Sequence, residues 1–289
     1  MTSHTRSYSD VPGLAGLYAR TVKATLLGKG EADADAGLRL ELPRLAADPR
    51  QLASYCEVTG FAKGSPYLPV TYPHILAFPL HLDLMSDPSF PFRPMGIVHL
   101  TNTITQHRPV PADATLAIEV RASELRPHTK GTVFDLLSDV LVNGEPVWSD
   151  VTTLLSRGRA AEDAPGSELL PDPGVDVTAR WELESNLGRR YAGVSGDRNP
   201  IHLYKLTAQA FGFPRQIAHG MWAKAAALAE IDAELPDAFS VRVDFRKPLL
   251  LPAKADFGYR TGGDGVTDLA IYNPDNGEPH LIGKVTPAQ

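Results

Sequence analysis

Residues 191–196 read YAGVSG, and residues 55–60 read the closely similar YCEVTG. A second pair of matching stretches follows in the same order, with Arg108-Pro109-Val110 in the first half and Lys247-Pro248-Leu249 in the second. In both pairs, the second-half stretch lies nearly the same number of residues after its first-half counterpart. Between them, each half places one helix pattern and then a strand pattern. This order predicts that the chain contains two copies of one structural unit.

Helix patterns mark the middle of each half. Residues 71–85 are apolar enough for a buried helix, with Pro73 at its start and a kink at Pro79. Residues 221–231 are rich in alanine and contain no helix breaker, and Pro236 ends the pattern. Both segments are therefore predicted as the central helices of their units.

Strand patterns follow each helix. In the first half the alternating or β-branched stretches are 98–107, 114–125, 131–142 and 147–156, with a hairpin turn at Asn143-Gly144. In the second half they are 240–249, 253–260, 265–273 and 281–285, with a tight turn at 262–265. The predicted fold class is α+β, with two antiparallel sheets, each wrapped around a central helix and joined in one chain.

A linker is predicted between the two halves. The chain has 289 residues, enough for about two domains. Residues 158–177 are rich in Gly, Pro, Ala and acidic residues and lack apolar periodicity. The predicted domains are therefore an N-terminal unit at residues 1–157 and a C-terminal unit at residues 178–289.

Composition and charge exclude several classes of protein. With 43% hydrophobic and 21% charged residues, the chain has the composition of a globular protein rather than a disordered one. Its 34 acidic residues outnumber 28 Lys and Arg, so there is no overall basic field for nucleic acid. Cys56 is the single cysteine, which removes disulfides and cysteine-based zinc sites. No stretch approaches the roughly 20 apolar residues of a membrane span, and we expect a cytoplasmic protein.

The densest cluster of chemically active residue types is the stretch YAGVSGDRNPIH, which ends at His202. Asn199 and Pro200 are favoured as the N-cap and first residue of a helix, which places His202 in its first turn. A tight turn at Gly196 can then bring the Asp197 carboxylate toward the imidazole. The positive start of a helix keeps a histidine neutral, so this pair could share and deprotonate one water molecule.

A plain turn is the alternative interpretation, because Ser, Gly, Asp, Asn and Pro all favour turns. The repeat instead favours a catalytic role for Asp197 and His202. In the first half, the matching stretch keeps the Val-Thr-Gly scaffold but has Phe61 in place of Asp197 and Pro66 in place of His202. We therefore expect one active site per chain, in the second half.

The pattern Tyr-x2-Val-Ser-Gly-Asp-x-Asn-Pro-Ile-His is followed by Ala210 and by the segment IAHGM at residues 217–221. Together these residues resemble the MaoC-like (R)-specific enoyl-CoA hydratases and 3-hydroxyacyl-thioester dehydratases. The resemblance is close over residues 191–227 and extends over most of the second half. The first half resembles the degenerate copy of double-hotdog members of this family, so the resemblance implies a double hotdog fold.

The resemblance also implies roles for individual residues. Asp197 and His202 would be the catalytic pair that adds water to trans-2-enoyl thioesters, giving (3R)-3-hydroxyacyl thioesters in fatty-acid metabolism, or that runs the reverse dehydration. The backbone N–H of Gly220 would bind the thioester oxyanion. Independently of the resemblance, Ser195 and Asn199 are expected to support the active loop through side chain to backbone hydrogen bonds rather than to react.

Other candidates concern substrate binding. Four cations could meet the phosphates of coenzyme A or an acidic carrier protein: Arg198, Arg215, Arg246 and Lys247. Phe78 could line an acyl tunnel in the first half, with plain core as its alternative role. His219 is interpreted equally well as a packed or capping residue and as a contributor to the site.

No cofactor and no metal are predicted. The sequence lacks the HExxH, GxGxxG, GxxxxGK[ST] and GxSxG patterns. His74 and His81 are spaced two helical turns apart, which we take as too far to share a tetrahedral ion.

Two alternative functions stay open at this point. One is a hotdog acyl-thioesterase, which would also use a carboxylate, and the other is a non-catalytic acyl-binding subunit. The expected partner is an acyl-CoA or acyl-carrier-protein thioester substrate, with no nucleic acid and no membrane span. A homodimer and a monomer are both compatible with two fused units.

Overall fold

The computed structural model describes residues 4–27, 37–158 and 163–288. Its chain divides into two compact units. Unit 1 comprises Met1–Ala47, Pro73–Asn102 and Asp113–Glu168, and unit 2 comprises Asp48–Tyr72, Thr103–Ala112 and Leu169–Gln289. The units thus interleave along the sequence. The sequence-based division follows the repeat along the chain instead. It stays a prediction, with an N-terminal unit at residues 1–157, a linker at 158–177 and a C-terminal unit at 178–289.

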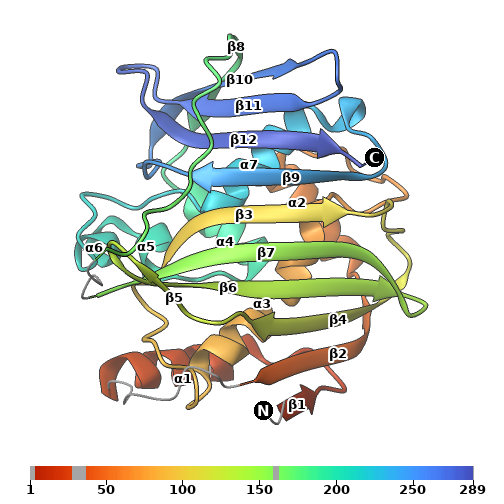
Figure 1. Ribbon diagram of the computed structural model, residues 1–289, viewed down its shortest axis with the longest axis vertical. Helices are drawn as coiled ribbons and strands as arrows, with labels where there is room; N and C mark the ends of the chain where they lie inside the picture. The colour runs from red at the N-terminus through yellow and green to blue at the C-terminus, as the bar shows by residue number, and fades with distance from the viewer. Residues whose placement is uncertain (1–3, 28–36, 159–162, 289) are drawn as a thin grey trace. The chain divides into compact units, whose positions relative to one another are not determined.

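Unit 1 contains a sheet of long strands (Figure 1). Its elements are β1 (His4–Ser7), α1 (Leu14–Leu27), β2 (Leu38–Ala46), α3 (Tyr72–Ser86), β3 (Val98–Gln106), β4 (Thr115–Ala122), β5 (Arg126–His128), β6 (Gly131–Val142) and β7 (Glu145–Arg157). Strands pair in the order β1-β2-β4-β6-β7, with β5 beside β6. The pairs are antiparallel as predicted, except that β1 runs parallel to β2. α3 begins, and β3 ends, within the residues of unit 2.

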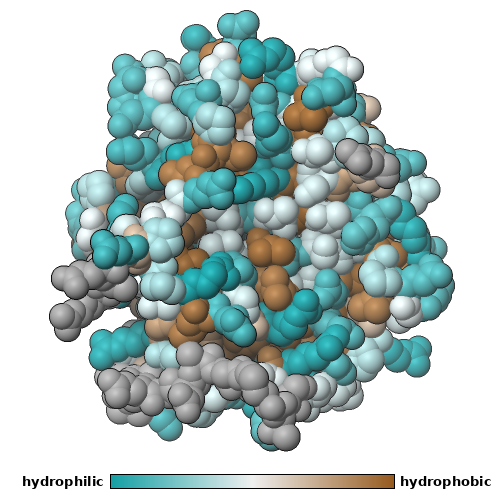
Figure 2. Space-filling model, in the orientation of Figure 1, coloured by the Kyte–Doolittle hydropathy of each residue, from teal (hydrophilic) through white to brown (hydrophobic). Residues whose placement is uncertain are grey.

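The sequence patterns account for these elements. Along β6, buried and partly exposed residues alternate, as expected for a sheet with one covered face. Asn143 and Gly144 both have positive φ, 54° and 82°, and form the predicted two-residue turn between β6 and β7. α3 confirms the predicted apolar helix, with Pro79 inside it. The strand face of unit 1 that is turned to the viewer in Figures 1 and 2 mixes hydrophilic with hydrophobic side chains.

A buried polar cluster lies in unit 1. Asp150 accepts a hydrogen bond from Asn102 Nδ2 at 2.7 Å, and its other oxygen lies 2.5 Å from His74 Nδ1. His81 Nε2 lies 2.6 Å from Ser138 Oγ. The two histidine rings are 5.3 Å apart, edge to face, and that they do not share a metal ion stays a prediction. Each ring instead has its own hydrogen-bond partner, and burial lowers the pKa of His81 to about 3.

Unit 2 carries a further set of paired strands and most of the described helices. Its helices are α2 (Pro49–Thr59), α4 (Leu187–Ser195), α5 (Pro200–Leu203), α6 (Lys205–Gln209), α7 (Gly220–Glu230) and the 3-10 turn η1 (Asp232–Glu234). Its strands are β8 (Val177–Leu183), β9 (Phe239–Phe245), β10 (Ala253–Thr261), β11 (Thr267–Tyr272) and β12 (Pro279–Pro287). They pair antiparallel in the order β9-β12-β11-β10-β8. α7 is the predicted alanine-rich helix, and its residues 221–228 are all buried.

The two matching sequence stretches occupy equivalent places in unit 2. YCEVTG ends α2, and YAGVSG ends α4. In both, the final glycine takes the left-handed conformation, with φ of 94° at Gly60 and 77° at Gly196. Each glycine N–H donates to a helix carbonyl, at 2.8 Å to Cys56 and 3.1 Å to Ala192. The turn at Gly196 agrees with the prediction, whereas the two helices that precede these glycines are not predicted by the sequence patterns.

Among the described residues, no helix is both long and apolar enough to cross a membrane.

The burial of neutral His81 predicts a loss of stability in mild acid. The imidazole of an unfolded chain titrates near pH 6.5, whereas burial lowers the pKa of folded His81 to about 3. Between these values unfolding takes up a proton, so the free energy of unfolding decreases as the pH falls, by up to about 1.4 kcal/mol per pH unit from this residue. Urea unfolding of the full chain at several pH values between about 7 and 5 measures this slope.

The His81→Gln variant should show a shallower dependence on pH than the unmodified chain. His107→Gln, at an exposed position, is the control and should keep the original slope because its side chain is in solvent in both states. Equal slopes for the unmodified chain and His81→Gln would contradict the assignment.

Candidate active site

His202 is held by the short helix α5. Asn199 caps this helix, with its Oδ1 accepting the Ile201 N–H at 3.4 Å, and Pro200 is the first residue, as predicted. The imidazole is buried, and its Nδ1 lies 2.9 Å from the carbonyl oxygen of Ile217. A carbonyl only accepts, so Nδ1 carries the proton and Nε2 presents its lone pair. Burial lowers the pKa of His202, which keeps the ring neutral.

Further contacts fix α5 within unit 2. The Ile217 N–H donates to a carbonyl of α5 at 3.1 Å, so Ile217 binds this helix through both its N–H and its carbonyl. Arg189 on α4 donates to the Leu203 carbonyl at 2.9 Å. α4 also approaches so closely that a Cβ at Gly188 would lie 2.0 Å from the His202 carbonyl oxygen. Only glycine fits there, and the sequence analysis missed this requirement because Gly188 lies outside the motif.

The Asp197 carboxylate follows the left-handed turn at Gly196. The Asp197 N–H donates to Ser195 Oγ at 3.1 Å, and its Oδ1 accepts the Asn199 N–H at 3.0 Å. These bonds fix the turn and the direction of the carboxylate. They are of the kind expected for loop support by Ser195 and Asn199, whose contribution to activity stays a prediction. The Asp197 side chain is 30% exposed, so water or a ligand can reach it.

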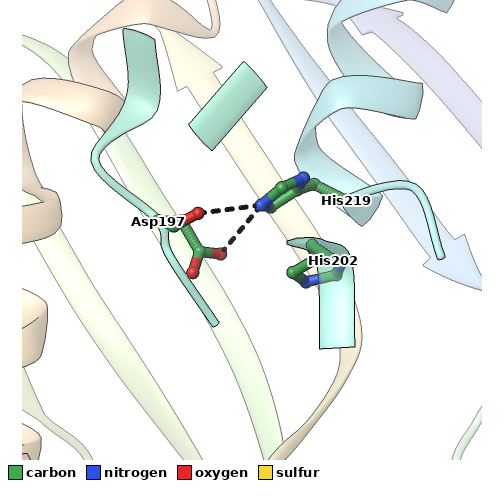
Figure 3. Close-up of side chains that lie close together, drawn as sticks. All are labelled: Asp197, His202 and His219. Carbon is green, nitrogen blue, oxygen red and sulfur yellow. Dashed lines mark hydrogen bonds and ion pairs between the residues drawn. The ribbon is translucent and has the colours of Figure 1, made fainter. Parts of the chain in front are cut away.

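His219 lies against both members of the predicted pair (Figure 3). Its Nε2–H donates to the carbonyl oxygen of Asp197 at 3.0 Å and lies 3.8 Å from the Asp197 Oδ2. Its ring stacks on that of His202, with centroids 3.7 Å apart and 24° between the planes. Burial and the neighbouring His202 lower the pKa of His219 to about 3. From the sequence alone the role of His219 stays open, and its one signal is its place directly before Gly220.

The spacing of the pair suits a shared water molecule. A carboxylate oxygen of Asp197 and one ring nitrogen each of His202 and His219 all lie within 4.8 Å of one another. One water making two hydrogen bonds of about 2.8 Å at a roughly tetrahedral angle spans about 4.6 Å. The separation of the two side chains is therefore close to the one at which a single water can bridge a carboxylate and a neutral imidazole.

The same three residues fit a metal ion poorly. The Nε2 of His219 carries the proton that it donates to Asp197, so this nitrogen has no lone pair to offer. The rings of His202 and His219 lie in nearly parallel planes, and their in-plane lone pairs cannot both point at one ion. Proton transfer through water is the chemistry that this arrangement favours.

Gly220 is the first residue of α7 and is preceded by His219 as the N-cap. At this position its N–H has no acceptor within the helix, and the helix dipole favours a negative charge nearby. A Cβ at Gly220 would lie 2.8 Å from Cε1 of Phe245, so the position excludes a side chain unless Phe245 shifts. These features suit the predicted oxyanion contact, which stays a prediction.

The remaining predicted residues lie apart from these contacts. Arg215 is exposed, and Lys247 forms an exposed ion pair with Glu278 at 3.4 Å. Phe78 is partly buried in α3, in unit 1. Their roles in substrate binding stay predictions.

Comparison with known proteins identifies relatives of the chain. Residues 161–263 match the family model of the MaoC like domain. The chain is 42% identical over 244 residues to 3-hydroxyacyl-thioester dehydratase X of Mycobacterium tuberculosis, which covers 83% of this chain and 86% of that protein. It is 26% identical over 224 residues to 3-hydroxyacyl-thioester dehydratase Y of the same organism, covering 66% and 75% of the two chains.

Solved structures are also similar. The crystal structure of HtdX from Mycobacterium tuberculosis matches with a TM-score of 0.77 at 39% identity, covering 86% of this chain and all of that one. A MaoC-like dehydratase from Phytophthora capsici matches with a TM-score of 0.72 at 19% identity, covering 87% and 95%. The predicted α+β double hotdog fold is thereby confirmed. On the strength of the 42% identity over most of both chains, this chain belongs to the MaoC-like dehydratase family.

Proposed function

We propose that the chain is a hydro-lyase of fatty-acid metabolism that reversibly adds water to trans-2-enoyl thioesters and yields (3R)-3-hydroxyacyl thioesters. The observation that carries this proposal is the neutral His202 imidazole, buried and fixed in one tautomer, within 4.8 Å of the Asp197 carboxylate. The names of the relatives, 3-hydroxyacyl-thioester dehydratases X and Y, support it. A cytoplasmic location and a homodimer stay predictions.

The water between the two side chains is the nucleophile. His202 accepts a proton from it through Nε2 while the water oxygen bonds to C3 of the enoyl thioester. The electron pair of the double bond moves toward the thioester carbonyl, and the pair of residues returns a proton to C2 from the same side. The product gains one hydroxyl group at C3 and one hydrogen at C2, so no further reactant is needed.

Two charges develop during this reaction, and the site offers a partner for each. The imidazolium that forms on His202 lies beside the Asp197 carboxylate, whose charge raises the pKa of His202 against the effect of burial. The enolate oxygen of the thioester can accept a hydrogen bond from the N–H of Gly220 at the positive end of α7. Both partners are fixed before the substrate arrives, which lowers the cost of reorganisation.

The alternative reaction is hydrolysis of the thioester. The same water would then attack C1 and break the C–S bond, releasing a free thiol. Assays that follow the conjugated double bond and the free thiol in parallel distinguish the two reactions. A non-catalytic subunit would bind an enoyl thioester and change neither signal.

Removal of either reacting side chain should abolish hydration. Asp197→Asn and His202→Ala are expected to lower kcat on a short trans-2-enoyl-CoA by at least about 100-fold, because each removes part of the general acid–base pair. The measurement is the loss of enoyl absorbance, together with a melting curve that should change little. Unchanged hydration in both variants, or stoichiometric release of thiol by the unmodified chain, would contradict the proposed reaction.

The dependence of activity on pH should follow the titration of His202. Burial lowers the pKa of this base below its usual value near 6.5, so it stays neutral and active in mild acid. We expect kcat/KM to hold as the pH falls to about 6.5 and to decline only below it, as His202 is protonated. In Asp197→Asn, the decline in residual activity should move to lower pH, since the charge that raises the pKa is gone. A midpoint above the usual value would be incompatible with a desolvated base.

The contact between α4 and α5 can be tested with two alanine substitutions in the same helix. Gly188→Ala places a Cβ against the His202 carbonyl, so α5 must shift and kcat should fall by about 100-fold, as expected for a displacement on the order of 1 Å. Gly193→Ala is the matched control, because a Cβ there meets nothing within 4 Å. It should keep full activity and gain up to about 1 kcal/mol of stability from helix propensity. Equal activities of the two variants would show that the close approach does not position His202.

A further inference from the structure

His219 is the residue of the site that the proposed reaction leaves without a role. It is 3% exposed and contacts two aromatic partners, with its ring centroid 3.7 Å from that of His202 and 4.8 Å from that of Tyr191. Tyr191 is itself buried on α4. The ring of His219 therefore supports one face of the His202 imidazole and is in turn supported from α4.

A hydrogen bond ties the same ring to the other member of the pair. The His219 Nε2–H donates to the Asp197 carbonyl at 3.0 Å, and one of the dashed lines in Figure 3 marks this bond. The Asp197 N–H and Oδ1 are bound to Ser195 and Asn199. With all three contacts made, the Asp197 main chain cannot rotate the carboxylate away without breaking a hydrogen bond.

The position of His219 in the chain adds a third connection. It is the N-cap of α7, so its Cα is one residue from Gly220. The preceding residue, Ala218, is held by its N–H, which donates to the carbonyl of Leu249, between β9 and β10, at 2.9 Å. One anchored side chain thus connects the start of α7 with the carboxylate and the imidazole.

His219 is poorly suited to exchange protons itself. Its Nε2–H is committed to the Asp197 carbonyl, and its Nδ1 is buried with no hydrogen-bond partner among the described residues. Burial and the adjacent His202 lower its pKa to about 3, so the ring stays neutral during turnover near neutral pH. A neutral ring can lie against His202 without opposing the positive charge that forms there.

We infer that His219 is a positioning residue: through one hydrogen bond and one ring stack, it sets the separation of Asp197 and His202 beside the N-terminus of α7. This inference rests on the proposed function, because the separation matters for the shared water. The substrate need not touch His219.

Two substitutions separate the hydrogen bond from the stack. His219→Phe keeps a ring against His202 but removes the donor, and should lower kcat on an enoyl-CoA by about 100-fold with KM within about threefold of the original. His219→Gln carries an amide Nε2 at a similar reach from the backbone and should recover kcat to within about tenfold of the original. His280→Phe is the matched control: His280 also binds a backbone carbonyl, that of Lys247 at 3.1 Å, and this variant should keep full activity.

A double-mutant cycle tests whether His219 acts through the pair. In a His202→Ala background, His219→Phe should lower the residual rate by no more than about twofold, since the base it positions is gone. Melting curves of all variants establish that they fold. A large KM increase with unchanged kcat, an equal loss in both backgrounds, or full activity of His219→Phe would each overturn the inference.

A spectroscopic readout distinguishes failure of this inference from failure of the proposed function. Imidazole nitrogen NMR of the unmodified chain should show His202 protonated at Nδ1 and His219 at Nε2, and His219→Phe should shift the His202 signals. If the unmodified chain hydrates no enoyl thioester but these signals appear as expected, the proposed function fails and the contacts stand. If hydration is normal and the His202 signals are unmoved in His219→Phe, the positioning role is wrong.

Discussion

The hydrogen bond from His202 Nδ1–H to the Ile217 carbonyl is the contact on which the site depends. It fixes which nitrogen carries the proton, and burial of the ring prevents a second proton from binding near neutral pH. Ile217 can serve this purpose because its N–H is bound to α5 and its neighbour Ala218 to the Leu249 carbonyl. The imidazole proposed as the base is therefore oriented by backbone that is itself held by further hydrogen bonds.

The duplicated helices explain how the site can rest on a rigid support. α2, from the first copy, lies within unit 2 and binds α4 through Gln51 Nε2, which donates to the Val194 carbonyl at 2.8 Å. It also accepts a hydrogen bond from Trp222 of α7 at the Val58 carbonyl, at 2.9 Å. After its final glycine, α2 continues into buried Phe61, where α4 continues into Asp197. The first stretch thus places an apolar side chain where the second places the carboxylate of the proposed site.

Short sequence patterns made much of the fold and the start of α5 predictable from the sequence. Asn199-Pro200 fixes the start of α5, Asn143-Gly144 fixes a hairpin, and alternation fixes the strands, because each depends on a few neighbouring residues. The interleaving of the units, the buried pair His74–Asp150, and the requirement for glycine at position 188 were not predictable, since they arise from segments distant in sequence. His219 was ambiguous for the same reason: its partner Asp197 lies in another loop, and no spacing rule connects them.

The central claim is that one carboxylate and one neutral imidazole act on a single water from one side of the substrate. The most direct test is hydration of a trans-2-enoyl thioester in deuterated water, with the product analysed by proton NMR. We expect one deuterium at C2, on the same face as the new hydroxyl group at C3, with the thioester intact. Addition from opposite faces, or oxygen from solvent at C1 with loss of the thiol, would contradict it.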